Sequence, residues 1–116
     1  PTEPLTEKRE LMDEVISYIE DHLAEKITLQ SAAAHFFVST RTISRLFSDK
    51  MDVSFYRYVT QRRLIAAKSL ILSGEPLESI SVQVGFADYS TFYRAFKQAF
   101  SISPRQFEKL QARRFG

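Results

Sequence analysis

The 116-residue chain has no cysteine, only three glycines and four prolines, and no apolar run near the roughly 18 to 20 residues of a membrane-spanning helix. Without cysteine it has no disulfide framework, no cysteine-based zinc site and no thiol catalysis, which fits a reducing cytosol. Few glycines and prolines, combined with the helical spacing of the apolar residues, leave little room for a β-sheet. No secretory signal peptide is visible.

Sequence signatures of enzymes and metal sites are also missing. There is no G-x-S-x-G nucleophile elbow and no glycine-rich phosphate loop, and many serines fall at expected helix starts. His22 and His35 belong to different predicted helices and lack the spacing of a metal pair, so we interpret both as ordinary surface or packing residues. We therefore expect no enzymatic activity, no cofactor and no metal.

The net charge of +2 is small but unevenly distributed. Residues 1–27 carry three basic and eight acidic side chains, a net −5, whereas residues 28–116 carry 13 basic and six acidic ones, a net +7. The basic part is what a phosphate-binding surface requires, although an ordinary solvated surface has the same composition. Because the chain begins with Pro1 instead of methionine, we expect a fragment or a processed piece of a longer protein.

The most specific pattern is a repeat with a spacing of about 49 residues. Residues 29–47 and residues 77–96 each read as a helix, a tight turn and a second helix, with one additional residue in the second turn. The aligned pairs are Leu29 with Leu77, Ala32 with Ile80, Phe36 with Val84, Val38 with Phe86, Ile43 with Phe92, Arg45 with Arg94, and Phe47 with Phe96. Two helix-turn-helix copies in one chain predict a protein that reads DNA with two motifs.

Apolar spacing and capping residues predict an all-α fold of seven helices and no strand. We expect two helix-turn-helix subdomains joined by a long linker helix. The expected helices cover about residues 7–24, 29–36, 40–50, 54–72, 76–84 and 89–100, and a last short one starts at Ser103-Pro104. In the second recognition helix the expected inward side chains are Phe92, Ala95, Phe96, Ala99 and Phe100.

These helices suggest a division of the chain. We expect a linker end at residues 1–6, a double helix-turn-helix domain at residues 7–112 and a basic tail at residues 113–116. Within the domain, the first half covers residues 7–52, the linker helix residues 53–73 and the second half residues 74–112. About 19 helical residues span roughly 28 Å, which is compatible with two recognition helices near one DNA repeat of roughly 34 to 36 Å apart.

The outward faces of the two recognition helices supply the candidate DNA contacts. They are Thr40, Arg41, Ser44 and Arg45 in the first motif, and Tyr89, Ser90, Tyr93, Arg94 and Lys97 in the second. Arg45 and Arg94 are equivalent positions, and arginine pairs bidentately with guanine, although a phosphate contact or an ion pair is the simpler alternative. The two tyrosines either contact thymine methyls or phosphates or cover the end of their helix. Among other basic residues, Arg63 is expected to pack along the core.

The second repeat is similar to the signature of AraC/XylS-type transcription regulators. The matching residues are Glu78-Ser79-Ile80, Val84-Gly85-Phe86-Ala87-Asp88, Phe92, Arg94, Phe96-Lys97, Ser103-Pro104 and Phe107. The upstream half of the same family resembles the first repeat at Ala33, Val38-Ser39, residues 43–47, Arg63-Leu64, Ala67 and Leu70-Ile71. The resemblance covers about residues 10–110 and implies a seven-helix DNA-binding domain. It maps the family's recognition residues to Arg41, Ser44 and Arg45 and to Tyr89, Ser90, Tyr93 and Arg94.

One position departs from the family pattern. Phe37 stands in the first turn where glycine is common, and a bulky residue at positive φ would cost on the order of 1 kcal/mol or more. Either this turn is strained, or Phe37 has ordinary dihedral angles and packs into the core. We favour the packed alternative because residues 36–38 form the most apolar run near either turn.

The resemblance also implies partners and a location. We expect double-stranded DNA as the partner, RNA polymerase as a further one, and a separate N-terminal sensing or dimerisation domain outside this chain. No membrane association is expected, and the location is the bacterial cytoplasm, at the nucleoid. The alternative is a helical protein-interaction module whose basic face binds an acidic partner. Outward serine, threonine, arginine and lysine side chains favour DNA over that alternative, which calls for outward apolar anchors.

Overall fold

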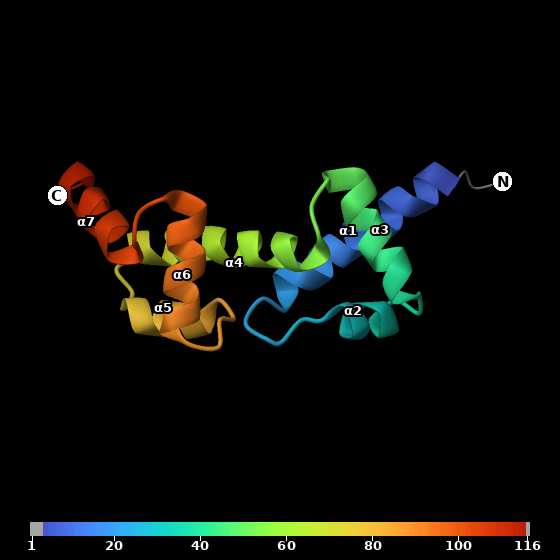
Figure 1. Ribbon diagram of the computed structural model, residues 1–116, viewed down its shortest axis with the longest axis horizontal. Helices are drawn as coiled ribbons and strands as arrows, with labels where there is room; N and C mark the ends of the chain where they lie inside the picture. Colours follow the sequence, from blue (N-terminus) through green and yellow to red (C-terminus); the bar gives the residue numbers. More distant parts are fainter. Residues whose placement is uncertain (1–3, 116) are drawn as a thin grey trace. The chain divides into compact units, whose positions relative to one another are not determined.

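Seven α-helices account for the regular structure of the described part of the chain (Figure 1). The computed structural model describes the backbone of residues 4–115 and the side chains of residues 10–113, and this part of the chain contains no strand. The helices are α1 (Pro4–Asp21), α2 (Leu29–His35), α3 (Thr40–Met51), α4 (Phe55–Leu72), α5 (Leu77–Gln83), α6 (Tyr89–Phe100) and α7 (Pro104–Phe115). The expected all-α fold is therefore confirmed.

The ends of the chain are more helical than expected. Helix α1 begins at Pro4 and ends at Asp21, about three residues earlier at both ends than its apolar spacing indicated. Residues 1–3 of the expected linker lie outside the described residues, as does Gly116 of the expected tail. Helix α7 continues through Phe115, so the basic end that we expected to follow the last helix is part of it.

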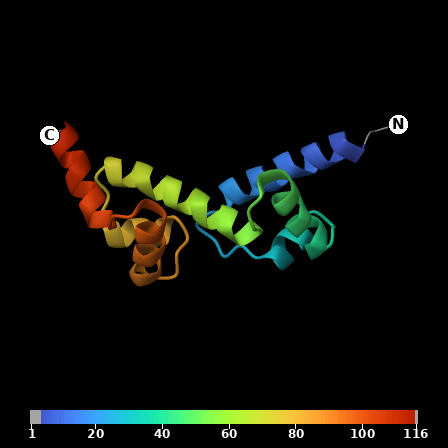
Figure 2. The same cartoon turned by 45° about the horizontal axis from the view of Figure 1, so that its top comes forward.

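The chain divides into two compact units between Val59 and Thr60, inside α4 (Figure 2). Helices α1, α2 and α3 and the start of α4 enclose the first core, whose most deeply buried side chains are Val15, Ile19, Ala32, Ile43, Phe47, Phe55 and Val59. The rest of α4, with α5 and α6, encloses the second core, which includes Leu64, Ala67, Ile80, Phe92 and Phe96. One helix thus supplies buried side chains to both cores.

Equivalent hydrogen bonds end the first helix of each motif. The Val38 N–H donates to the Ala33 carbonyl and the Phe86 N–H to the Ser81 carbonyl, each over 3.0 Å. In each turn the residue just before the donor, Phe37 or Gly85, has a positive φ. The recognition helices then start with equivalent caps. The Thr42 N–H donates to the Ser39 hydroxyl oxygen over 3.1 Å, and the Thr91 N–H donates to the Asp88 carboxylate over 2.8 Å.

The structural repeat extends further than the sequence alignment showed. Each recognition helix ends at a left-handed residue, Asp52 with φ 54° and Ser101 with φ 67°. A serine cap follows two residues later, because Ser54 accepts from the Arg57 N–H and Ser103 accepts from the Gln106 N–H, both over 3.1 Å. The start of α4 in the first unit is therefore equivalent to the start of α7 in the second.

Phe37 contradicts the packed alternative that the sequence favoured. Its φ is 56° and its side chain is 95% exposed, while the equivalent Gly85 has φ 102°. The prediction was wrong because the left-handed residue that ends α2 carries its side chain away from the helix pair. Phe36 and Val38, on either side, do pack against the first core.

A second correction concerns α6. Ala99 was expected to face inward, but its side chain is exposed. The last turn of α6 is covered through Phe100, whose ring centroid lies 4.7 Å from that of Phe96. The other expected inward residues of this helix are buried or half-buried.

Replacing Phe37 with glycine should stabilise the domain, because it removes a side chain from a left-handed position that buries almost none of it. We expect Phe37→Gly to raise the free energy of unfolding by up to roughly 1 kcal/mol, as seen in thermal melts. In the equivalent turn, Gly85→Phe should lower it by at least as much. A lower melting temperature for Phe37→Gly would show that the exposed ring stabilises the fold.

Candidate nucleic-acid interface

Helix α3 separates an apolar face from a polar one. Ile43, Leu46 and Phe47 are buried in the first core. The predicted contact residues Thr40, Arg41, Ser44 and Arg45 are all exposed on the same helix. Because Ser39 caps the helix, these side chains occupy its first two turns. No aspartate or glutamate occurs between Lys26 and Ser48, so no carboxylate of this segment neutralises Arg41 or Arg45.

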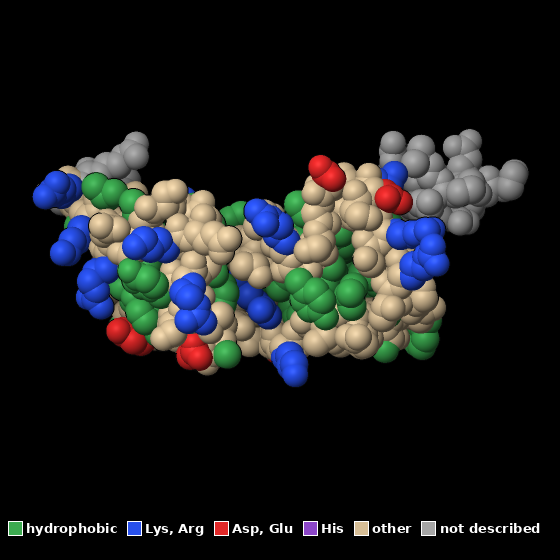
Figure 3. Space-filling model, viewed as in Figure 1, with side chains coloured by type: hydrophobic (Ala, Val, Ile, Leu, Met, Phe, Trp, Pro, Cys, Tyr) green, Lys and Arg blue, Asp and Glu red, His purple; other side chains and the backbone are tan. Residues whose placement is uncertain are grey.

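Helix α6 has the same organisation in the second unit. Phe92 and Phe96 are 0% exposed and anchor the helix on its core. The predicted contact residues Ser90, Tyr93, Arg94 and Lys97 are exposed. In the view of Figure 3, the part of the second unit covered by α6 and α7 carries several lysine and arginine side chains. No acidic residue occurs from Tyr89 to Phe107.

Tyr89 differs from the other predicted contacts of α6. Its side chain is half-buried, and its ring centroid lies 5.9 Å from that of Phe92 and 6.3 Å from that of Tyr93. Burial raises the pKa of its hydroxyl. This packing fits the alternative that Tyr89 covers the start of the helix. Tyr93 lies further out, with the Lys97 Nζ 6.0 Å from its ring centroid.

Two basic residues of α4 pack within the second unit. The Lys68 Nζ lies 4.3 Å from the ring centroid of Phe100 and 5.2 Å from that of Phe107. This geometry is that of a cation–π contact, which leaves Lys68 less available to phosphates than an extended surface lysine. Arg63 is half-buried, and burial lowers the pKa of its guanidinium, as its expected position along the core requires.

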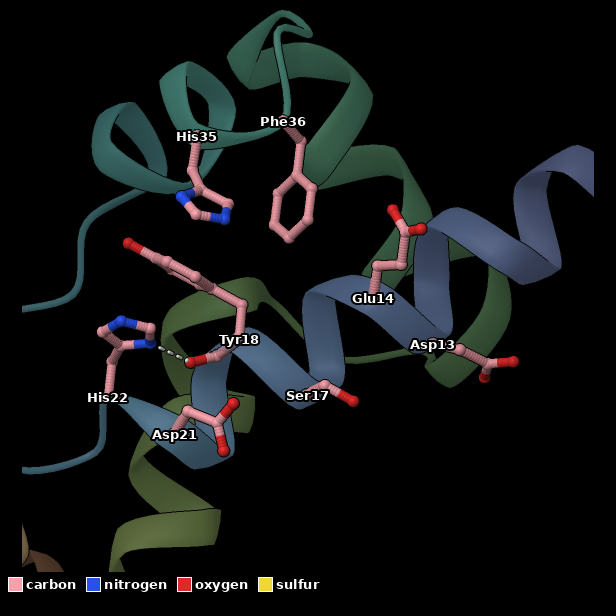
Figure 4. A pocket seen from close by; sticks show the side chains of 8 residues that line it. All are labelled: Asp13, Glu14, Ser17, Tyr18, Asp21, His22, His35 and Phe36. Atoms are coloured by element: carbon pink, nitrogen blue, oxygen red, sulfur yellow. Dashed lines mark hydrogen bonds between the residues drawn. The ribbon is translucent and has the colours of Figure 1, made fainter.

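The two histidines flank one tyrosine in the first unit (Figure 4). The Tyr18 ring centroid lies 4.4 Å from that of His22 and 4.6 Å from that of His35. The His22 Nδ1 is also 2.7 Å from the Tyr18 carbonyl oxygen. Tyr18 and the two histidines line an open hollow of about 350 Å³ together with Asp13, Glu14, Ser17, Asp21 and Phe36. The half-buried His22 and the exposed His35 both stack on Tyr18, and the described residues contain no group of three side chains placed to hold a metal ion.

Sequence reasoning missed two exposed residues at the start of the first recognition helix. Thr42 is exposed, and its hydroxyl is 3.0 Å from that of Ser39, so the first turn of α3 presents an additional polar side chain. Phe37 precedes the cap and was expected in the core. The signal that could have placed it outside is its alignment with Gly85, since a repeat keeps its backbone conformation more strictly than its residue type.

The fold and this surface define a class of protein: a DNA-binding domain with two helix-turn-helix motifs. A family model described as a helix-turn-helix domain matches residues 32–110. The chain is 31% identical over 99 residues to the HTH-type transcriptional activator RhaS of Citrobacter koseri, covering 84% of this chain and 36% of that protein. The chain spans about a third of the length of the curated relatives it matches.

Two solved structures have the same fold. The C-terminal domain of AraT, a response regulator from Geobacillus stearothermophilus, superimposes with a TM-score of 0.82 at 30% identity, covering 86% of this chain and 84% of that one. The DNA-binding domain of AdpA, solved in complex with a target DNA, gives a TM-score of 0.83 at 20% identity, covering 88% and 93%. The chain belongs to the AraC/XylS family, as the DNA-binding domain of this class of transcription regulators. This class is not one of enzymes, and no described helix has the length and apolar character needed to span a membrane.

The N-cap of α6 is a carboxylate, Asp88, so the stability of the domain should depend on pH. The backbone N–H and the hydroxyl of Thr91 bind the Asp88 carboxylate and hold its pKa below the usual value, with a smaller attraction from Arg94. A lowered folded pKa gives stability that is complete above the unfolded value of about 3.9 and is lost as the pH falls through the folded value. Asp88→Asn should therefore have a lower melting temperature than the parent domain at pH 7. This difference in melting temperature should shrink as the pH falls below about 4.

Ser39→Ala provides the matched control, because Ser39 caps α3 without a titrating group. Its deficit in melting temperature should be the same at pH 7 and at acid pH. A deficit of Asp88→Asn that stays constant over this range would show that the carboxylate charge does not contribute to the cap.

Proposed function

We propose that this domain binds double-stranded DNA sequence-specifically, with α3 and α6 in successive major grooves of one duplex. The observation that carries the proposal is the equivalence of the two recognition faces. Apart from the half-buried Tyr89, the predicted contact residues of both faces are exposed. Each face lacks carboxylates in its first two turns and places an arginine, Arg45 or Arg94, two residues before a fully buried phenylalanine. The AdpA domain, which has the same fold and was solved in complex with a target DNA, supports the same function.

The shared helix supports the use of both motifs on one duplex. Helix α4 is continuous over 18 residues, about 27 Å at 1.5 Å per residue. Phe55 and Val59 belong to the first core, and Leu64, Ala67 and Ile71 to the second. Major grooves on one face of B-DNA recur every 34 to 36 Å or so, a distance of the same order as the length of this helix.

We further propose that the domain is part of a bacterial regulator that activates transcription in the cytoplasm, at the nucleoid. The similarity to the transcriptional activator RhaS supports an activating role. The two thirds of the relatives' length that this chain does not match support an additional sensing or dimerisation domain. Exposed Asp13, Glu14 and Asp21 make part of α1 acidic, which suits RNA polymerase or that domain better than DNA.

A footprint on selected DNA tests the two-groove proposal. Duplexes that bind the domain would be selected from a random pool, and the strongest would be protected from hydroxyl radicals. We expect an asymmetric site of about 15 to 20 base pairs with two protected major-groove boxes about 10 base pairs apart. Protection of a single box would show that only one motif reads DNA.

The two arginines should each contribute to one box. Arg45→Ala and Arg94→Ala should weaken binding to the selected site by about 1 to 3 kcal/mol and relax base preference in one box only, as measured by anisotropy titrations. Both variants should keep the parent melting temperature because both side chains are exposed.

Arg105→Ala is the control for the loss of one positive charge. Arg105 is exposed on α7, 4.0 Å from Glu78, outside both recognition helices. Its removal should affect selected and random DNA equally. The same uniform loss for Arg45→Ala or Arg94→Ala would assign those arginines to phosphates.

A further inference from the structure

We infer that Phe37 is a DNA-contacting residue of the first motif, whose ring covers sugar and thymine-methyl surface at the edge of the groove that α3 enters. This inference rests on the proposed function. It concerns a residue outside the recognition helices and adds an apolar contact to an otherwise polar set.

The fold gives Phe37 no structural task. Its side chain is 95% exposed, and it belongs to no core cluster of the described residues. Its φ of 56° is a conformation that non-glycine residues adopt at a cost of roughly 1 kcal/mol. The equivalent turn is built with Gly85, so the motif forms without a side chain here. A strained backbone conformation at an exposed residue, with no packing that requires it, points to a functional role.

The position of Phe37 ties it to the recognition helix. It lies two residues before the Ser39 cap and three before Thr40, the first helical residue of α3. Its N–H donates to the Ala34 carbonyl over 3.3 Å, and the next residue, Val38, donates to Ala33 over 3.0 Å. These bonds hold the backbone at Phe37, so its side chain leaves the turn next to the start of α3.

The surrounding chemistry favours DNA over a protein partner. The exposed residues nearest in sequence are Ala34, His35, Ser39 and Thr40, and Arg41 follows. A protein-binding anchor is usually the centre of an apolar patch, whereas the exposed residues that follow this ring in sequence, Ser39, Thr40 and Arg41, are polar or basic. DNA presents phosphates beside the apolar faces of its sugars and the methyl groups of thymine. A single ring next to arginine and hydroxyl groups matches that surface.

The test separates DNA affinity from stability in the same variants. Phe37→Gly should bind the selected duplex about three- to tenfold more weakly, although its melting temperature does not fall. Phe37→Tyr keeps the ring and should retain most of the affinity. Leu72→Ala, which removes an exposed apolar side chain at the end of α4, is the matched control and should leave affinity unchanged.

A duplex with the first box scrambled locates the contact. On this duplex Phe37→Gly and the parent domain should bind equally, because the ring no longer meets its groove. If Phe37→Gly and the parent bind the intact selected duplex equally, the inference is overturned. Normal DNA binding combined with lost transcriptional activation in the full-length regulator would also overturn it and assign the ring to a protein partner. A parent domain that does not distinguish selected from random duplexes would overturn the proposed function itself.

Discussion

The direction of each recognition helix depends on one buried phenylalanine. Phe47 and Phe96 are both 0% exposed, and each is held by other rings. The ring centroid of Phe47 lies 5.4 Å from that of Phe55 and 5.1 Å from that of Tyr58, and the ring centroid of Phe96 lies 5.7 Å from that of Phe107. Two residues along a helix correspond to about 200° of rotation, so burying the phenylalanine turns the arginine two positions earlier to solvent. The polar face is therefore a consequence of how the apolar face packs.

Much of this organisation could be predicted from the sequence, because it depends on local signals. Apolar spacing located the helices, and Ser39 and Asp88 marked the starts of the recognition helices. Apolar spacing gave a wrong prediction in the first turn, where the backbone conformation determines the direction of the side chain. The apolar run around Phe37 indicated a core position, but side-chain direction at a left-handed residue follows the backbone. Ala99 was misplaced because helical spacing does not show where a core ends.

The candidate interface divides in the same way. Helical spacing correctly predicted that the side chains of the candidate interface are exposed, except for Tyr89. This side chain is half-buried because it packs against Phe92. Contact with DNA does not follow from exposure, since a solvated polar face has the same appearance. The base preferred by each motif depends on atoms of a partner, and those contacts stay predictions for this chain.

Helix α4 takes part in both structural repeats. Its first turn has the place in the first unit that the start of α7 has in the second, with equivalent serine caps. Its later buried residues Leu64, Ala67 and Ile71 repeat the spacing of Met12, Val15 and Ile19 on α1. The seven residues between α1 and α2 exceed the four between α4 and α5, which hides this part of the repeat in the sequence.

A shared helix makes the two units hard to separate. A cut between Val59 and Thr60 would interrupt α4 in mid-helix and give both fragments a frayed end at their core. Either motif alone would need its own copy of this helix. The two motifs therefore cannot be separated at the unit boundary without breaking a helix that both cores use.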